Sequence, residues 1–466
     1  MVAGSTGAGT AKMGVGMLRH SEPGPKDLWF LPLGGCGEIG MNLNLFGHNG
    51  QWIMVDCGVH FTQPQDFNAQ PIIEMPDTSF VDHLKGRLVA LLVTHAHEDH
   101  IGAIARLWHR WECPLVATPF AAEIIRRRAR GRRSPVPEPI IETHPGNEKH
   151  FGCFKVRWVA MNHSTPETCG LEIETAAGRI FHSADWKIDT APLMGKGFTK
   201  KPYEALGLRG VDAMTSDSTN AFVEGSSASE SEVRSNLIEL IQQLDGRVVV
   251  TCFSSNIVRL QTILEAASKS GRYVCLLGRS VSMMVDCAKS LHLLNDDFSW
   301  VEQRHVGYLP PEEVLFIATG SQGEVDSGLS RLSKRSHRHV DLEKGDTVIF
   351  SSRTIPGNEK AVQSLCKRFR DAGVNVLHAD ESPLVLHASG HPCQEELETM
   401  YRLINPRVVI PVHGDTKHLG KNAQIAENVG VPEIIKGLNG DLFMISPKPS
   451  VIKNFCKVGK VLTSPA

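Results

Sequence analysis

Long apolar runs are missing from the sequence: nowhere do about 18 apolar residues follow one another, so no membrane-spanning helix is expected. A strong charge of either sign is missing too, because 49 Lys and Arg residues stand against 51 Asp and Glu residues. The net charge is −2 over 466 residues. No global positive field therefore indicates a nucleic-acid partner, and any such surface must be local.

Paired cysteines are also absent. The 11 cysteines are scattered singly without a Cys-x-x-Cys pair, and their odd number excludes a complete set of disulfides. This pattern is typical of a reduced, cytoplasmic protein. Apolar residues make up 41% of the chain, which excludes a mostly disordered protein.

Short apolar runs alternate with amphipathic helical patterns from Leu28 onward, which predicts an α/β fold. From about Thr219 to Asp371 the chain has a strand–helix alternation of its own, with Gly and Ser turns after the strands, which indicates a doubly wound unit inserted into an outer domain. The predicted buried strands are Trp52–Val55, Leu88–Val93, Val156–Met161, Arg179–Phe181, Ala213–Thr215, Val248–Thr251, Val274–Leu277, Val314–Ala318, Thr347–Phe350 and Val408–Val412. Helices are expected over Val233–Leu244, Leu260–Ala267 and Val362–Phe369.

The densest chemical signal is Thr94-His95-Ala96-His97-Glu98-Asp99-His100, between a predicted strand and a helical pattern. Imidazole nitrogens and carboxylate oxygens are the ligands that zinc takes in catalytic sites. A solvated polar loop rarely carries three histidines and an aspartate in six residues. The motif therefore predicts a metal site on a strand-to-helix loop.

Five more polar residues end apolar runs, namely Asp56, His163, Asp185, Asp217 and His413. In open α/β sheets, ligands gather at the carboxyl ends of the strands. Each residue has a plainer interpretation when taken alone, such as a helix cap for Asp217 or a turn residue for Asp56. Together with the histidine motif they predict one cleft.

These residues resemble a known family. His95–His100, with Asp56, His163 and Asp185, resembles the metallo-β-lactamase fold signature. The segments that contain Asp217 (residues 216–220), His391 (387–391) and His413 (411–415) resemble the three extra motifs of its β-CASP branch. Further stretches resemble ribonuclease J: Leu33–Asn42, Ser254–Ile257, Gly278–Ser280, Ala318–Glu324 and Ile355–Glu359.

The resemblance, over about Leu28 to Leu442, implies an αββα metallo-β-lactamase sandwich with an inserted β-CASP α/β domain that forms one wall of the cleft. The expected division is a disordered tail (1–26), the metallo-β-lactamase domain in two parts (27–217 and 374–446), the β-CASP domain (218–373) and a C-terminal tail (447–466).

Carried over by position, the resemblance implies two zinc ions per chain. One would be held by His95, His97 and His163 and the other by Asp99, His100 and His413, with Asp185 as the bridge. The implied catalytic residues are Asp56, Asp99, Asp185, Asp217 and His391. Of these, Asp56 would orient a metal ligand, and His391 would contact the scissile phosphate.

The substrate-binding residues implied by the resemblance are Ser254, Ser255, Asn256, His387, Ala388, Ser389, Gly390 and His391, which would bind the nucleotide and its 5′-monophosphate. From the residues alone, the Ser254–Asn256 turn is equally compatible with a plain helix N-cap. The basic run Arg126–Arg133 is open to two interpretations, RNA contact or a solvated face.

The implied function is a zinc-dependent ribonuclease in RNA maturation or decay, a 5′-to-3′ exonuclease that is also expected to cut internally. Its partner would be single-stranded RNA with a 5′-monophosphate, with no membrane partner, and a homodimer is left open. In β-CASP enzymes the position of His413 is typically His in RNA-acting members. The alternatives are a DNA nuclease, a hydrolase of small esters or thioesters, or a non-catalytic RNA-binding subunit.

Overall fold

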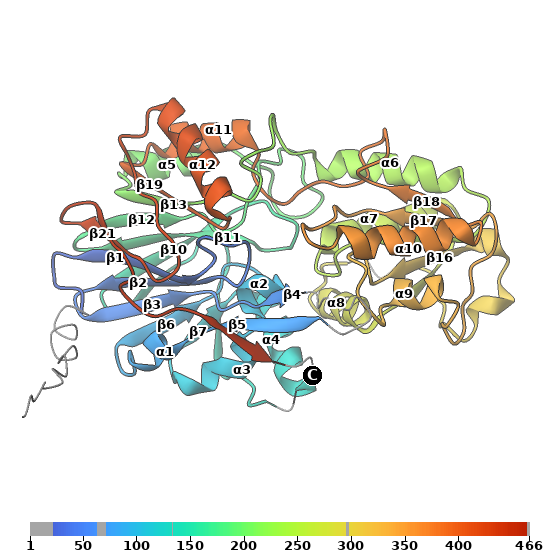
Figure 1. The fold of residues 1–466 in the computed structure, drawn as a ribbon, viewed down its shortest axis with the longest axis horizontal. Coiled ribbons are helices and arrows are strands. Elements are labelled where there is room, and N and C mark those ends of the chain that lie inside the picture. The colour runs from blue at the N-terminus through green and yellow to red at the C-terminus, as the bar shows by residue number, and fades with distance from the viewer. Residues whose placement is uncertain (1–21, 63–70, 133, 295–297, 464–466) are drawn as a thin grey trace, which may run out of the picture.

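The computed structural model describes residues 22–62, 71–132, 134–294 and 298–463. Two large sheets stack face to face in one half of the molecule, with helices on both outer sides, and a third sheet with its own helices forms the other half (Figure 1). This arrangement confirms the predicted α/β class, with four αββα layers and an inserted α/β unit. The expected tail 1–26 falls almost wholly outside the described residues.

The first large sheet has eight strands in the order β22-β21-β1-β2-β3-β6-β7-β8. Their bounds are Ser450–Ile452, Leu442–Ser446, Leu28–Gly34, Leu43–His48, Gln51–Val55, Leu88–Leu92, Leu115–Ala117 and Ile140–Glu142. The helices associated with it are α1 (Ser79–Asp82), α2 (Glu98–Ile101), α3 (Ile104–Leu107) and α4 (Pro119–Gly131).

The second large sheet has seven strands in the order β20-β19-β13-β12-β11-β10-β9. Their bounds are Glu433–Ile434, Val408–Val412, Ala213–Asp217, Gly178–His182, Cys169–Thr175, Phe154–Ala160 and Glu148–Phe151. Helices α5 (Lys201–Leu208), α11 (Gln394–Ile404) and α12 (Thr416–Val429) cover its outer face (Figure 1). Between the two sheets, Phe30 and Phe443 from one pack with Trp158 and Ile410 from the other.

The inserted unit is a five-stranded parallel sheet in the order β15-β16-β14-β17-β18. Its strands are Tyr273–Leu277, Val314–Ala318, Val248–Thr251, Thr347–Phe350 and Asn375–His378. Helices α6 (Glu230–Gln242), α7 (Ile257–Lys269) and α8 (Arg279–Ser290) cover one face, and α9 (Gly328–Ser333) and α10 (Glu359–Asp371) cover the other. Because both faces are covered, β14 and β16 are fully buried, and all of their residues except Thr251 are apolar.

The strands bear on two of the expected domain boundaries, the end of the insert and the start of the C-terminal tail. β18 pairs with β17 just beyond residue 373, so we propose that the insert runs to the end of β18. The expected C-terminal tail contributes β22 to the first sheet, while β23 (Lys460–Thr463) joins β5 (Ile72–Pro76) and β4 (His60–Thr62) in a three-stranded sheet.

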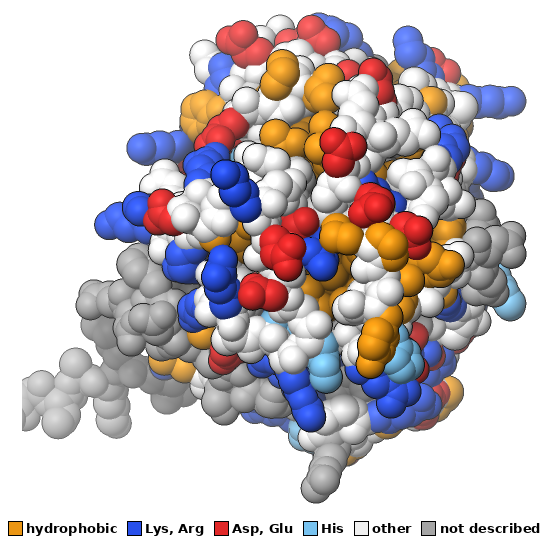
Figure 2. Space-filling view, turned by 90° about the vertical axis from the view of Figure 1, so that its right-hand side faces the viewer, with side chains coloured by type: hydrophobic (Ala, Val, Ile, Leu, Met, Phe, Trp, Pro, Cys, Tyr) orange, Lys and Arg blue, Asp and Glu red, His pale blue; other side chains and the backbone are white. Residues whose placement is uncertain are grey.

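Seen from the end that the insert forms, acidic and basic side chains are interspersed (Figure 2). The near-neutral net charge therefore does not hide a face of one sign at this end. Among the described residues, no helix combines the length and the apolarity needed to cross a bilayer.

Candidate metal centre

Polar side chains follow strands of both large sheets. Asp56 follows β3, the His95–His100 motif follows β6, Asp185 follows β12, Asp217 ends β13 and His413 follows β19. Asp56 and His413 have left-handed backbone conformations, with φ of 63° and 55°. Residues other than Gly adopt this conformation rarely, and it is often found at functional sites.

Three imidazoles form the first ligand set. Nδ1 of His97 lies 3.2 Å from Nε2 of His95 and 3.0 Å from Nε2 of His163. Burial lowers the pKa of His97 to about 4 and lowers the pKa values of His95 and His163 well below their usual value, so all three rings are neutral. Three lone pairs therefore converge, at separations close to the ~3.3 Å expected between nitrogens bound ~2.0–2.1 Å from a tetrahedral zinc.

Asp185 links this set to a second one. Its Oδ2 lies 3.8 Å from His95 Nε2 and 3.2 Å from His100 Nε2. In the second set, His413 Nε2 lies 3.3 Å from Asp99 Oδ2, and His100 Nε2 lies 3.6 Å from the same oxygen. Within each set the ligand atoms all lie within 4.8 Å of one another. The chemistry and spacing of the donors fit two metal ions that share Asp185.

Hydrogen bonds behind the rings fix which nitrogen faces the centre. The fully buried Asp56 accepts from Nδ1 of His100 at 2.7 Å and from the hydroxyl of Thr94 at 2.8 Å. That hydroxyl in turn accepts from Nδ1 of His95 at 3.0 Å. His163 donates from Nδ1 to the carbonyl oxygen of Gly390 at 2.6 Å. Each of these three rings is thereby held with Nε2 toward the centre.

Asp217 and His391 form a pair beside the second set. Asp217 Oδ2 lies 2.8 Å from His391 Nδ1, and its Oδ1 accepts from the Thr219 hydroxyl at 2.8 Å. That hydroxyl also lies 2.7 Å from His413 Nδ1. A third possible ligand group consists of Asp185, Asp217, His391 and His413. The predicted catalytic and metal-binding residues thus lie together.

In this region the carboxylates raise the pKa values of neighbouring imidazoles, and the imidazoles lower the pKa values of the carboxylates. Burial alone would raise the pKa of Asp185, but His413 and His100 hold it well below its usual value. Burial would lower the pKa of His413, but Asp185 and Asp217 raise it to about 10. The pKa of His391 is also raised, because Asp217 and Asp185 outweigh burial.

Three orienting residues were not predicted, namely Asn42, Thr94 and Thr219. Asn42 Nδ2 lies 2.9 Å from His100 Nε2 and 3.4 Å from Asp99 Oδ2, so it borders the second ligand set. Thr94 and Thr219 directly precede or closely follow predicted site residues. In the sequence both lie inside the quoted motifs (94–100 and 216–220), but nothing there marks their side chains as orienting groups.

The predicted substrate-binding residues fall into two groups. In the His387–His391 loop, Ser389 Oγ accepts from Asn220 Nδ2 at 2.7 Å, and Gly390 lies against His163. In the other group, Asn256 caps α7, with its Oδ1 accepting from the backbone of Arg259 at 2.9 Å. Within the described part of the chain, no hydrogen bond or ion pair joins the Ser254–Asn256 turn to the metal ligands.

Three arginines of the basic run pair with carboxylates. Arg126 pairs with Glu138 at 2.8 Å and with Glu142 at 2.9 Å, and Arg127 pairs with Glu123 at 2.6 Å. Arg128 pairs with Glu98. These pairings count against RNA contact as the main role of these three arginines.

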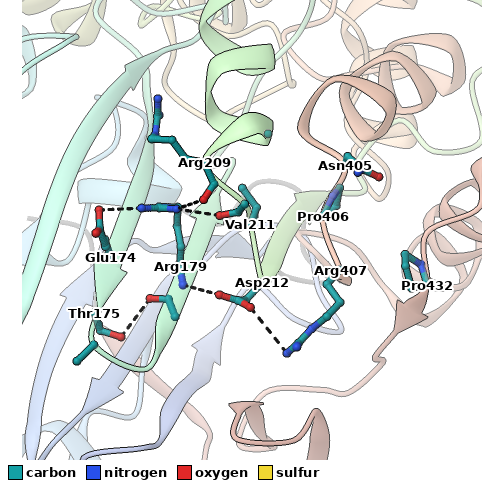
Figure 3. A pocket seen from close by; sticks show the side chains of 14 residues that line it. Glu174, Thr175, Arg179, Arg209, Val211, Asp212, Asn405, Pro406, Arg407 and Pro432 are labelled. Atoms are coloured by element: carbon teal, nitrogen blue, oxygen red, sulfur yellow. Dashed lines mark hydrogen bonds and ion pairs between the residues drawn. The ribbon is translucent and has the colours of Figure 1, made fainter.

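A hollow of about 680 Å³ lies at the opposite, amino-terminal end of β12, β13 and β19 (Figure 3). None of the predicted site residues lines it. Arg179 donates to the backbone of Arg209 and Gly210, and Asp212 accepts from the Arg179 backbone at 2.9 Å. Because its charged groups bind one another, the hollow does not compete with the metal centre as a reaction site.

Three family models match successive segments of the chain. The beta-lactamase superfamily domain matches residues 51–200, the ribonuclease J beta-CASP domain matches 245–369, and the Zn-dependent metallo-hydrolase RNA specificity domain matches 385–435. Fold and site therefore define a metallo-hydrolase of the metallo-β-lactamase superfamily with a β-CASP insert.

Similar proteins with known names show to which family of this superfamily the chain belongs. Ribonuclease J of Sinorhizobium meliloti is 38% identical over 446 residues, which cover 95% of this chain and 78% of the relative. Ribonuclease J of Mycolicibacterium smegmatis is 37% identical, with 94% and 78% covered. The chain belongs to the ribonuclease J family. A crystal structure of a protein of unknown function from Enterococcus faecalis V583 shares the fold, with a TM-score of 0.62, 15% identity, and 90% of this chain and all of that chain covered.

Proposed function

We propose that this chain is a zinc-dependent ribonuclease that hydrolyses RNA phosphodiester bonds with two zinc ions. It removes nucleotides in the 5′-to-3′ direction from a 5′-monophosphate end and also cuts internally. The observation that carries the proposal is Asp185, whose carboxylate belongs to two ligand sets at once. The names of the ribonuclease J relatives and the match to an RNA specificity domain support RNA as the substrate.

The two ligand sets suit the reaction. When bound, two zinc ions supply Lewis acidity that lowers the pKa of a water to about 7 and offsets the negative charge of the phosphodiester. The chain holds the ligands ready for this task, because Asp56, Thr94 and the Gly390 carbonyl fix three of the rings. Little reorganisation is then needed when substrate arrives.

His391 is the proposed proton donor to the leaving oxygen. Its Nδ1 is held by Asp217, so its Nε2 is left for the substrate, and its side chain is 21% exposed. Its pKa is raised by Asp217 and Asp185, which favours the protonated ring, and a cation at this place would also stabilise the developing charge on the phosphate.

The insert supports a polymeric substrate. Both connections between the insert and the sandwich carry site residues, namely Asp217–Asn220 on one side and the His387–His391 loop on the other. An ester of small size needs no such second wall. The proposal therefore favours a nucleic-acid strand over a small ester or thioester.

The experiment offers zinc-loaded protein three labelled RNAs that differ only in a 5′-monophosphate, 5′-triphosphate or 5′-hydroxyl end, beside a matched DNA. Mononucleotide release from the monophosphate RNA is the expected result. His97→Ala should lower it by at least ~100-fold, while the exposed His109→Ala serves as a control with unchanged activity. Turnover of DNA or of a thioester without RNA cleavage would overturn the proposal.

A further inference from the structure

Arg259 is a fully buried cation in the insert, outside the metal centre. From α7 its guanidinium binds Glu230 at the start of α6 through two bonds, of 3.1 and 3.0 Å. The remaining arm donates to the Ser351 carbonyl at 2.9 Å, to the Ser351 hydroxyl at 2.6 Å and to the Leu386 carbonyl at 3.2 Å. The planar fork of arginine can make all of these contacts at once, which a lysine cannot.

Leu386 is the point where this cluster meets the site. Its carbonyl also accepts from the Ser351 hydroxyl at 2.7 Å, and its side chain is buried. Gly390, only four residues further along, accepts from His163 at 2.6 Å, and His391 binds Asp217 at 2.8 Å. Only three residues separate Leu386 from Gly390, so the Leu386 anchor and the His163 contact lie on one short segment.

On its other side, the cluster contacts the segment that follows Asp185, the proposed bridging residue. The backbone N–H of Glu230 donates to Asp189 Oδ2 at 3.3 Å, and Lys187 lies 3.2 Å from the same oxygen. Lys187 and Asp189 are both almost fully buried, and they follow Asp185 by two and four residues. A ring of buried polar contacts therefore runs from one side of the metal centre through the insert to the other side.

Stability alone is a weak reason for such a pair, because apolar replacements of buried ion pairs are often neutral or stabilising. We propose that Arg259 is a positioning residue for the metal centre, one that fixes the Leu386–His391 loop and thereby the orientation of His163 and His391. The proposal rests on the proposed function only in that it takes His163 as a metal ligand.

The test compares Arg259→Lys with Arg234→Lys. Arg234 on α6 pairs with Glu265 on α7 at 2.6 Å, so it joins the same two helices without touching the loop. Both variants are loaded with Co²⁺ for visible absorption and titrated with Zn²⁺ against a chelator, well below their unfolding temperatures. The expected result is an altered Co²⁺ spectrum and about tenfold weaker zinc binding in Arg259→Lys alone.

Ser351→Ala keeps the test usable if Arg259→Lys fails to fold, since it removes the hydroxyl contact to Leu386 and leaves the Arg259–Glu230 pair intact. It should change the spectrum in the same direction by less. If Arg259→Lys has the wild-type Co²⁺ spectrum and zinc affinity, this inference is overturned, even if the variant unfolds at a lower temperature. If Arg259→Lys does not fold, the same result in Ser351→Ala overturns it. Neither result affects the proposed function. A wild-type chain that binds no metal would overturn the proposed function as well.

Discussion

The carbonyl oxygen of Gly390 accepts a hydrogen bond of 2.6 Å from Nδ1 of His163, a residue 227 positions earlier in the chain. A backbone group on the segment that leads from the insert back to the sandwich thereby orients a proposed metal ligand. The contact is close, because a Cβ added to Gly390 would stand 2.6 Å from the imidazole ring.

Gly390→Ala should therefore displace His163 and lower RNA cleavage by about 100-fold, with weaker zinc retention on dialysis. The matched control is Gly420→Ala in α12, where an added Cβ meets nothing within 4 Å. That control should keep full activity and gain up to ~1 kcal/mol in the free energy of unfolding, because Ala is the better helix former. Equal activity of the two variants would contradict the prediction.

Asp185→Asn should remove both metal ions, because one carboxylate serves both ligand sets. Elemental analysis after gel filtration should find fewer than half of the wild-type ions, and activity should fall by at least ~1000-fold. Asp212→Asn changes a carboxylate at the opposite end of the same sheet and should retain the metal. Two ions retained by Asp185→Asn would rule out the bridging role.

Thr94→Val should weaken metal binding without a change in side-chain shape. It removes the hydroxyl that lies between Asp56 and His95, so the ring of His95 loses its anchor. About tenfold weaker zinc binding in competition with a chelator is expected, while Thr94→Ser, which keeps the hydroxyl, should bind as the wild type does. If the Val and Ser variants bind zinc equally, the hydroxyl does not orient His95.

The pH profile of cleavage should report His391. Because its pKa is raised above the ordinary value, the protonated ring persists to higher pH than in an unperturbed histidine and is lost as the pH rises through that pKa, so kcat should fall on the alkaline side. Asp217→Asn removes the main raising influence and should move this limb down by about one pH unit or more. Asp380→Asn, which removes a carboxylate 3.5 Å from His378, should leave the limb in place. An unmoved limb in Asp217→Asn would assign the proton to another group.

Six strands of the sandwich, namely β3, β6, β10, β12, β13 and β19, could be predicted because they are apolar runs that end near a polar residue, whereas the sandwich itself was implied by the family resemblance. Asp56, Asp217 and His413 all follow this pattern, and the structure brings them together. β11 was missed because its sequence places Glu172 in the middle of the strand. That carboxylate is buried among arginines. Arg209 binds it at 2.7 and 2.9 Å, and Arg179 lies 3.1 Å from it, contacts between separate segments that no local pattern reveals.

The orienting groups of the site were beyond prediction for a similar reason. Whether Thr219 or Asn42 serves a metal ligand depends on which ring nitrogen its polar atom meets, and that depends on packing between sheets. For the Ser254–Asn256 turn, the sequence allowed two roles and only the structure shows which contact Asn256 makes. Asn256 matches a phosphate-binding turn and a helix cap equally well in sequence, and its side-chain oxygen caps α7.

The two chain crossings that join the insert to the sandwich carry the Asp217–His391 pair and the Gly390 carbonyl that orients His163. Deletion of the insert would leave Asp217 and His391 in the chain but remove the domain that connects their segments, so we expect both this pair and the contact to His163 to be lost. We therefore expect the sandwich and the insert to be inactive when they are produced as two separate proteins divided at these crossings.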